Sequence, residues 1–429
     1  MSTVVIVGGG YAGCSAAATA AKAGAEVLLL EKSDMLTGLG VLTGVLGGQG
    51  GFTVREEMRA MGGADIFEAI ESIVIHDIDY IELLNRRHIK VFNVLKLESA
   101  IRRVLDGAGV DIRLRARAKD VKMKGTRLTH IVLNDGSTIE GDVFVDATGG
   151  CGTVAECTKH GFGCVMCVMR CPTFGGRVSI SAKAGVKDLT AVRPDGKLGA
   201  FSSAFMLVKD SLARHLVAEM ESKGYIVVPL PKELIDYDKL EMITATENAR
   251  PEFLENLFIF DNGFAKVMVQ SYMPLDDLHS VPGFEYARMV DPISGGVGNA
   301  VRGLAMAPRE NSLSVQGLDN LYCAGEKSGP MSGMPAVILT GVLAGHNAAR
   351  RAFAKEDLVL PRSLSAGEFI AYEKEMMETP GALVRRYGFS GGHFFDRMKE
   401  QGLYSPDIEE IKARVEKTGL RDVFAQRVA

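Results

Sequence analysis

The sequence predicts an α/β fold: a doubly wound parallel sheet with a small antiparallel meander and an inserted α+β domain. Three observations carry this prediction. An apolar strand at residues 4–7 runs directly into spaced glycines and an alanine-rich helix. Short alternating strands follow between residues 111 and 140, and a second strand, glycine loop and helix occupy residues 317–352. Strands that alternate with helices are typical of a parallel sheet.

The amino-terminal segment TVVIVGGGYAGCSAAATAAKAGAEVLLLEK, residues 3–32, has the order of elements expected of a Rossmann-like dinucleotide-binding unit. Gly8 allows a tight turn, Gly10 lets a pyrophosphate approach the backbone, and Gly13 lets the helix pack closely on the strand. The helix start offers N–H groups and a positive dipole end to the phosphates. The second strand ends in Glu31, followed by Lys32, where an acidic side chain would accept hydrogen bonds from a ribose.

Length and composition predict a globular protein of two or three domains, with 429 residues, 49 glycines, no tryptophan and a net charge of −4. No stretch is long and apolar enough to cross a membrane. Because the charge gives no overall attraction to polyanions, nucleic acid is not expected as a partner, although a local basic face is compatible with this charge. Five of the seven cysteines lie between Cys151 and Cys171. This crowding does not resemble a secreted disulfide framework and favours a reducing cytoplasm.

The segments between these units are predicted from their patterns. Residues 37–52 hold seven glycines among apolar residues, so the backbone at Gly47 and Gly48 is expected to pack against a flat ligand. Residues 54–72 and 77–106 are predicted to form amphipathic helices. Strands from residue 111 to residue 140, with the turn Asn134-Asp135-Gly136, predict the meander, which leads into a buried strand at residues 142–146.

The changes of pattern also suggest the domain boundaries. Residues 1–155 and 290–355 are expected to be the two parts of the nucleotide-binding domain. Residues 156–289 are expected to be an inserted substrate domain, with a helix from residue 203 to residue 223. Residues 356–429 are predicted to be a helical tail.

Three separated motifs resemble those of the large flavoprotein group that includes glutathione-reductase-like and fumarate-reductase-like FAD enzymes. They are VVIVGGGYAG with Glu31, DVFVDATGG at residues 142–150, and LDNLYCAGE with SGMPAVILTGVLAGHNAA between residues 318 and 349. The resemblance implies that all three converge on one FAD, with Glu326 on the ribityl side and the helix start at Pro335 against the flavin. The implied cofactor-binding residues are Gly8, Gly10, Gly13, Glu31, Lys32, Gly47, Gly48, Val121, Ala147, Thr148, Gly149, Gly325, Glu326, Gly333, Met334, Pro335 and Ala336.

Two further segments are similar to the glucose-inhibited division protein A family of tRNA-modifying flavoproteins. GVLGGQGGFTVREEMRAMGG, residues 44–63, resembles that family's glycine-rich flavin segment, and Arg170-Cys171-Pro172-Thr173 resembles its R-x-C-P-S stretch. The sequence departs from the family in having no long helical carboxy-terminal extension of the kind used to hold tRNA. It also lacks the histidine and arginine patterns of a fumarate reductase.

The cysteine-rich segment admits three interpretations. Cys164, Cys167 and Cys171 have the spacing C-x2-C-x3-C-P, similar to the tail of a ferredoxin cluster motif. The same residues alternate as a buried strand does, so packing, a redox thiol and a cluster all stay open, and no metal site is predicted. Arg170 and Arg177 flank Cys171 and could grip an anion, which makes Arg170, Cys171 and Arg177 the candidate catalytic residues.

The expected function is FAD-dependent hydride transfer between the flavin and a small-molecule substrate that could be anionic. NAD(P)H or a redox protein is the expected electron donor, and the chain is expected to be a homo-oligomer without a membrane partner. Two alternatives stay open: a flavin-dependent tRNA-modifying enzyme, and an electron-transfer flavoprotein subunit with an iron–sulfur cluster.

Overall fold

A five-stranded parallel sheet of order β19-β10-β1-β2-β6 forms the centre of the chain. The computed structural model describes residues 2–38, 40, 43–150, 175–193, 196, 200–201, 204–237, 251–268, 273–290, 301–302 and 304–429. The strands are β1 (Thr3–Val7), β2 (Glu26–Leu30), β6 (Asp111–Arg113), β10 (Val143–Asp146) and β19 (Leu321–Cys323). Val4 of β1 pairs with Val27 on one side and with Val143 on the other. The carboxyl ends of all five strands therefore meet at one edge.

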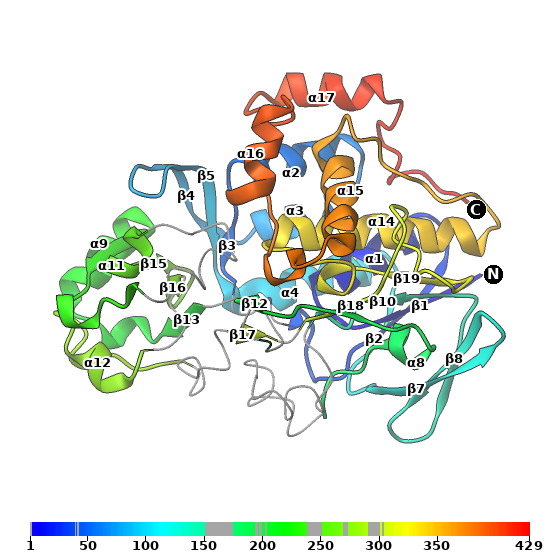
Figure 1. Ribbon diagram of the computed structural model, residues 1–429, viewed down its shortest axis with the longest axis horizontal. Coiled ribbons are helices and arrows are strands. Elements are labelled where there is room, and N and C mark those ends of the chain that lie inside the picture. The colour runs from blue at the N-terminus through cyan, green and yellow to red at the C-terminus, as the bar shows by residue number, and fades with distance from the viewer. Residues whose placement is uncertain are drawn as a thin grey trace.

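The two faces of this sheet are covered by different layers (Figure 1). Val4 and Ile6 of β1 face helices α1 (Tyr11–Lys22), α4 (Leu97–Gly107) and α14 (Met334–Ala352). Val5 and Val7 face a three-stranded meander of β7 (Ala118–Lys124), β8 (Arg127–Leu133) and β9 (Thr138–Glu140). Because side chains alternate along a strand, one apolar strand serves both layers. The predicted parallel sheet with an antiparallel meander is confirmed.

Helices α1 and α14 pack in parallel at close range. A Cβ atom on Gly341 would lie 2.4 Å from the Ala12 carbonyl oxygen, and one on Gly345 would lie 2.2 Å from that of Ala16. Ala12 is the second residue of α1, whereas Gly341 is the eighth residue of α14. At a rise of about 1.5 Å per residue, the start of α14 extends about 9 Å beyond the start of α1.

A second, antiparallel sheet lies at the other end of the molecule from the meander (Figure 1). Its order is β13 (Ala204–Leu207), β16 (Ala265–Met268), β15 (Asn256–Asp261) and β14 (Tyr225–Pro229). One face forms its own core with α9 (Arg214–Lys223) and α12 (Leu275–His279). The other face packs on a hairpin of β4 (Val74–Ile81) and β5 (Arg86–Phe92). The shorter elements are β3 (Val45–Leu46), α8 (Ile180–Lys183), β11 (Leu189–Thr190), β12 (Ala200–Phe201), α11 (Glu252–Glu255), β17 (Val301–Arg302) and β18 (Ala305–Met306).

The predicted helix at residues 77–106 is wrong over its first half, where the hairpin β4–β5 stands. Its strands pair directly, with Ile78 opposite Ile89 and Tyr80 opposite Arg87. The hairpin turn contains neither glycine nor proline, and Asn85 supplies the left-handed conformation at φ 48°. Asparagine tolerates this conformation better than most residues, but alone it is a weak turn signal. The helix itself is limited to α4.

Two other predicted helices are shorter than expected. Residues 54–72 contain two helices, α2 (Gly50–Ala60) and α3 (Asp65–Glu71), separated at Gly62, which has a φ of 77°. The segment predicted to be helical from residue 203 to residue 223 begins as strand β13 and becomes helical only at α9. In both cases the predicted helix spans the boundary between two separate elements of secondary structure.

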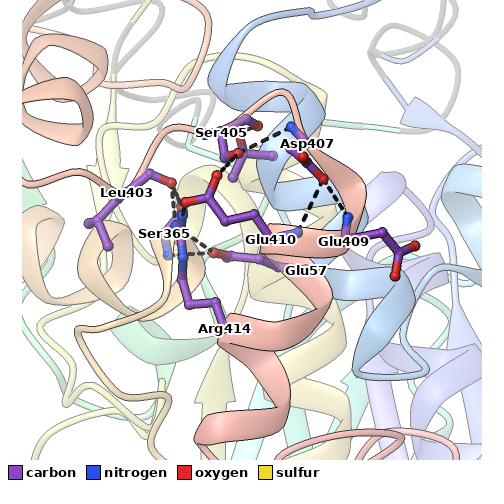
Figure 2. A network of polar contacts seen from close by, with 9 residues as sticks. Glu57, Ser365, Leu403, Ser405, Asp407, Glu409, Glu410 and Arg414 are labelled. Atoms are coloured by element: carbon purple, nitrogen blue, oxygen red, sulfur yellow. Dashed lines mark hydrogen bonds and ion pairs between the residues drawn. The ribbon is translucent and has the colours of Figure 1, made fainter.

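The carboxy-terminal helices α15 (Ser365–Glu378), α16 (Gly392–Glu400) and α17 (Ile408–Lys417) fold back onto α2 (Figure 1). Figure 2 shows the polar network that holds them. The buried Glu57 carboxylate of α2 accepts hydrogen bonds from the Ser365 and Ala366 N–H groups at 2.8 and 2.9 Å. It thereby caps the start of α15, with Arg414 of α17 at 3.8 Å. Among the described residues, no helix combines the length and the apolar character needed to span a membrane.

Candidate cofactor and active site

The first part of the site is the turn after β1. A Cβ atom on Gly8 would lie 2.3 Å from the Ala147 carbonyl oxygen, and one on Gly13 would lie 1.7 Å from that of Gly8. Glycine is therefore required at both positions for packing within the protein. Gly10 differs, because no described residue lies within 4 Å of the place a Cβ atom would take. Its backbone borders open space, and this is the cradle that a pyrophosphate needs.

In the described part of the chain, no side chain caps the two helix starts beside this edge. The N-cap residues are Gly10 for α1 and Gly333 for α14, which have no side chain to cap the helix, and neither helix has an acidic residue in its own first turn. The N–H groups of a first helical turn need partners from outside the helix, and their dipole end favours anions. The start of α14, with Met334, Pro335 and Ala336, therefore suits a group that becomes negative about 9 Å beyond the pyrophosphate. A dinucleotide with a flavin fits this arrangement.

Glu31 ties the glycine turn to the end of β2. Its buried carboxylate accepts hydrogen bonds from the Gly9 N–H at 2.8 Å and from the N–H and hydroxyl of Ser33 at 2.8 and 2.7 Å. A carboxylate has about four acceptor positions, so capacity for a ribose hydroxyl remains. The neighbouring Lys32 instead donates a hydrogen bond to the Gly175 carbonyl oxygen at 2.8 Å.

Asp146, which the sequence analysis missed, organises the segment after β10. One carboxylate oxygen accepts hydrogen bonds from the N–H and hydroxyl of Thr148, and the other accepts from the N–H groups of Ile180 and Ser181. Gly149 follows, and a Cβ atom there would lie 3.3 Å from a guanidinium nitrogen of Arg177. The structure thus places Ala147, Thr148, Gly149 and Arg177 together at the edge of the sheet. Val121 lies in β7 opposite Ile131 and packs on the cluster between the meander and the sheet.

The glycine-rich loop before α2 is packed against the protein's own atoms. A Cβ atom on Gly48 would lie 1.6 Å from the Arg87 carbonyl oxygen, and one on Gly47 would lie 2.4 Å from the Ser390 hydroxyl. Arg55 is buried and donates a hydrogen bond to the Gly47 carbonyl oxygen at 2.6 Å; burial lowers the pKa of its guanidinium to about 10. A Cβ atom on Gly51 would lie 3.3 Å from Pro335. The loop therefore lies beside the start of α14.

Gly325 and Glu326 follow β19, as the sequence predicts. The Glu326 carboxylate forms an ion pair with Arg386, which also donates from Nε to the Met331 carbonyl oxygen at 3.0 Å. Arg386 comes from the segment between α15 and α16. Because it lies sixty residues away along the chain, no local pattern could assign it to this site.

A second arginine, Arg309, supports the same loop. Arg309 donates from Nε to the Ser328 carbonyl oxygen at 2.8 Å, and its Nη2 lies 3.7 Å from Oε2 of Glu373 on α15. Glu373 is buried against Gly329, where a Cβ atom would lie 2.8 Å from Oε2. Burial raises the pKa of Glu373 to about 8, although Arg309 and Arg386 oppose this shift. The two arginines thus hold the loop that leads into α14 through the Ser328 and Met331 carbonyl groups.

The remaining candidates are only partly placed. Arg170 and Cys171, with the four other cysteines of the cluster that begins at Cys151, lie outside the described residues. The glycine-rich stretch at residues 291–300 also lies outside them. Of the three candidate catalytic residues, the structure places Arg177 only, beside Gly149.

Two family models match the chain. Residues 3–162 match FAD dependent oxidoreductase, and residues 250–356 match Glucose inhibited division protein A. With the cradle at Gly10 and the two uncapped helix starts, these matches define the class: the chain is an FAD-dependent oxidoreductase. The predicted class and cofactor are confirmed.

Within this class the chain resembles the glucose-inhibited division protein A flavoproteins. The form II crystal structure of Aquifex aeolicus GidA matches 97% of this chain and 76% of that chain, with a TM-score of 0.69 and 17% identity. The form I crystal of the same protein gives a TM-score of 0.58, with 15% identity, over 97% of this chain and 78% of that chain. These likenesses establish the fold.

The curated relatives match over shorter segments. One is the tRNA uridine 5-carboxymethylaminomethyl modification enzyme MnmG of Pediococcus pentosaceus, 41% identical over 88 residues, which is 20% of this chain and 13% of that protein. The MnmG of Chlorobium chlorochromatii is 31% identical over 115 residues, 26% of this chain and 17% of that protein. Each matched segment therefore spans less than a fifth of its relative.

These names correct one expectation. The sequence predicts no nucleic acid partner, and the relatives, which are named for a modification of tRNA, contradict this. The expectation rested on the net charge of −4. A net charge averages over the whole surface and does not describe a local face. Of the functions left open by the sequence, the comparisons favour the tRNA-modifying enzyme over transfer to a small molecule.

Proposed function

We propose that this chain is a flavin-dependent enzyme that acts on a uridine of tRNA. The observation that carries the proposal is the match of residues 250–356 to Glucose inhibited division protein A, because that segment includes the loop from Gly325 and all of α14. The segment that matches this family is therefore the one that would form the flavin side of the site. The identity of 41% to one MnmG over 88 residues supports the same assignment.

The residues of the edge have separate tasks in this proposal. FAD, when bound, would supply hydride transfer to or from carbon. The start of α1 and Glu31 would hold its pyrophosphate and ribose, and the N–H groups at the start of α14 would stabilise negative charge on the flavin. Arg309 and Arg386 keep the loop before α14 in place through the Ser328 and Met331 carbonyl groups. A uridine base would have to leave its stack to reach this edge.

Analysis of tRNA nucleosides tests the proposal without knowledge of further components. We expect cells from which the gene for this chain has been removed to lack a modified uridine that the parent strain contains. The wild-type gene should restore that nucleoside, and a Gly10→Val variant, whose side chain would enter the cradle, should not. Identical uridine nucleosides in the parent and deletion strains, measured by mass spectrometry, would contradict the proposed function.

A further inference from the structure

A band of cationic and aromatic side chains runs from the hairpin β4–β5 to the start of α16. It begins at Tyr80 and Arg87, which stand opposite each other on the two strands. The Arg87 guanidinium lies 4.8 Å from the centroid of the Tyr80 ring, and Tyr80 is 41% exposed. We call Tyr80, Arg86, Arg87, Arg385 and His393 the basic band.

The band continues across the start of α16. The Arg86 guanidinium donates to the Gln49 side-chain oxygen at 2.9 Å and lies against Gly391, where a Cβ atom would be 2.4 Å from Nη1. Two residues later, His393 accepts a hydrogen bond from Arg385 at 2.9 Å. Both Arg385 and His393 are exposed. Residues from two distant parts of the chain therefore form one surface.

Among the described residues, no carboxylate neutralises Arg87 or Arg385, the two outer arginines of the band. Neighbouring cations have acidic partners: Lys90 pairs with Asp77, Arg397 with Glu368 and Lys399 with Asp396. In the described part of the chain, neither Arg87 nor Arg385 has a carboxylate within ion-pairing distance. Exposed guanidinium groups without acidic partners can grip phosphate in a planar, bidentate manner.

The basic band borders the flavin side of the site. The Arg87 carbonyl oxygen accepts a hydrogen bond from the Gln49 N–H at 3.1 Å and packs on Gly48. Two residues further, Gly51 lies beside Pro335 at the start of α14. Only the loop before α2 separates the band from that helix start. A polymer held by the band would therefore have its neighbouring units at the edge where FAD binds.

We propose that the basic band is the surface on which the substrate RNA docks, with Arg87 and Arg385 on phosphates and Tyr80 under an unpaired base. The proposal rests on the proposed action on tRNA. Single-stranded RNA is held by cations that follow its backbone and by aromatic rings on which its bases stack. An acidic protein would also match the charge, but it would give the exposed Tyr80 ring no base to stack on. The combination of cations and an exposed ring therefore favours RNA.

Fluorescence anisotropy with a labelled, unmodified tRNA transcript tests this surface in the full-length, FAD-loaded protein. The double variant Arg87→Ala/Arg385→Ala should weaken binding roughly tenfold or more near 0.1 M salt, and should reduce the slope of log K against log salt by about 2. Tyr80→Ala should lower the affinity without changing this slope, because stacking releases no counterions. Lys122→Ala/Lys124→Ala removes the same charge from the exposed side of β7 and should change neither quantity.

The outcomes separate this inference from the proposed function. If wild-type protein binds tRNA and the Arg87/Arg385 variant binds it equally well, the docking surface is wrong and the proposed function stands. If the wild-type protein does not bind tRNA, both are overturned. Binding of polyglutamate in place of tRNA, lost in the same variant, would assign the basic band to an acidic protein and would also overturn the inference. Equal FAD content in all variants shows that the fold is retained.

Discussion

Replacing Gly10 with valine is expected to abolish FAD binding and leave the fold intact, whereas the same change at Gly13 is expected to disrupt the fold itself. A Cβ atom on Gly10 would enter open space, and the φ of −73° at this residue is ordinary for any side chain. The valine would therefore conflict only with the ligand. On Gly13 a Cβ atom would lie 1.7 Å from the Gly8 carbonyl oxygen, so β1 and α1 would have to separate.

These two variants should give opposite patterns of affinity and stability. We expect Gly10→Val to weaken FAD binding on the order of 100-fold or more, about 3 kcal/mol, with unchanged urea unfolding of the apoprotein. Gly13→Val should cost roughly 3 kcal/mol of unfolding free energy through overpacking. Gly107→Val is the matched control, because its Cβ atom would also meet nothing within 4 Å and it lies at the far end of α4. Normal FAD affinity in Gly10→Val would show that the pyrophosphate does not bind at this turn.

The second large effect is expected at Glu373, whose replacement by glutamine should change how stability depends on pH. Burial raises the pKa of this carboxyl from 4.5 to about 8, so the folded chain keeps a proton that the unfolded chain releases. The contribution of the Glu373 carboxyl to the free energy of unfolding is therefore fully present below about pH 4.5. This contribution decreases as the pH rises toward 8, by up to about 1.4 kcal/mol per pH unit. The loss ends above the pKa of the folded state.

Glutamine has the shape of the neutral acid and cannot ionise, so Glu373→Gln should lack this loss. Urea unfolding at about pH 5, 7 and 9 should show the variant gaining stability over the wild type as the pH rises. Arg309 and Arg386 face Glu373 and oppose the shift, and Tyr387 lies near it. Glu378→Gln, at an exposed position on the same helix, is the control and should show no such gain. A difference between Glu373→Gln and the wild type that does not vary with pH would contradict the buried neutral acid.

The nucleotide-binding unit could be predicted because its determinants are local. Gly8, Gly10 and Gly13 lie within six residues, and Glu31 closes the next strand, so that one continuous segment specifies strand, turn, helix and strand. The meander was predicted for the same reason, since its turn at Gly136 lies between strands adjacent in sequence. Close spacing in sequence leaves few alternative pairings.

The features that were missed depend on contacts between distant residues. Glu57 caps α15 across 308 residues, and Arg386 reaches Glu326 across sixty, so neither partner is marked by its own neighbours. The hairpin β4–β5 was missed because its charged residues also fit one face of a helix. Only the pairing of the two strands in the folded chain decides between the helical and the strand periodicity. The sequence shows the likeness to tRNA-modifying proteins in two segments, but the net charge and the expected lack of a long helical extension favour a small-molecule substrate.

Identification of the cofactor released from the purified chain tests the central claim most directly. The protein is denatured by heat, the precipitate is removed, and the supernatant is separated by chromatography against FAD, FMN and NAD standards. A single dinucleotide held by the starts of α1 and α14 predicts FAD, in an amount close to one per chain after reconstitution. Recovery of FMN or NAD instead, or of no nucleotide from protein incubated with FAD, would contradict it.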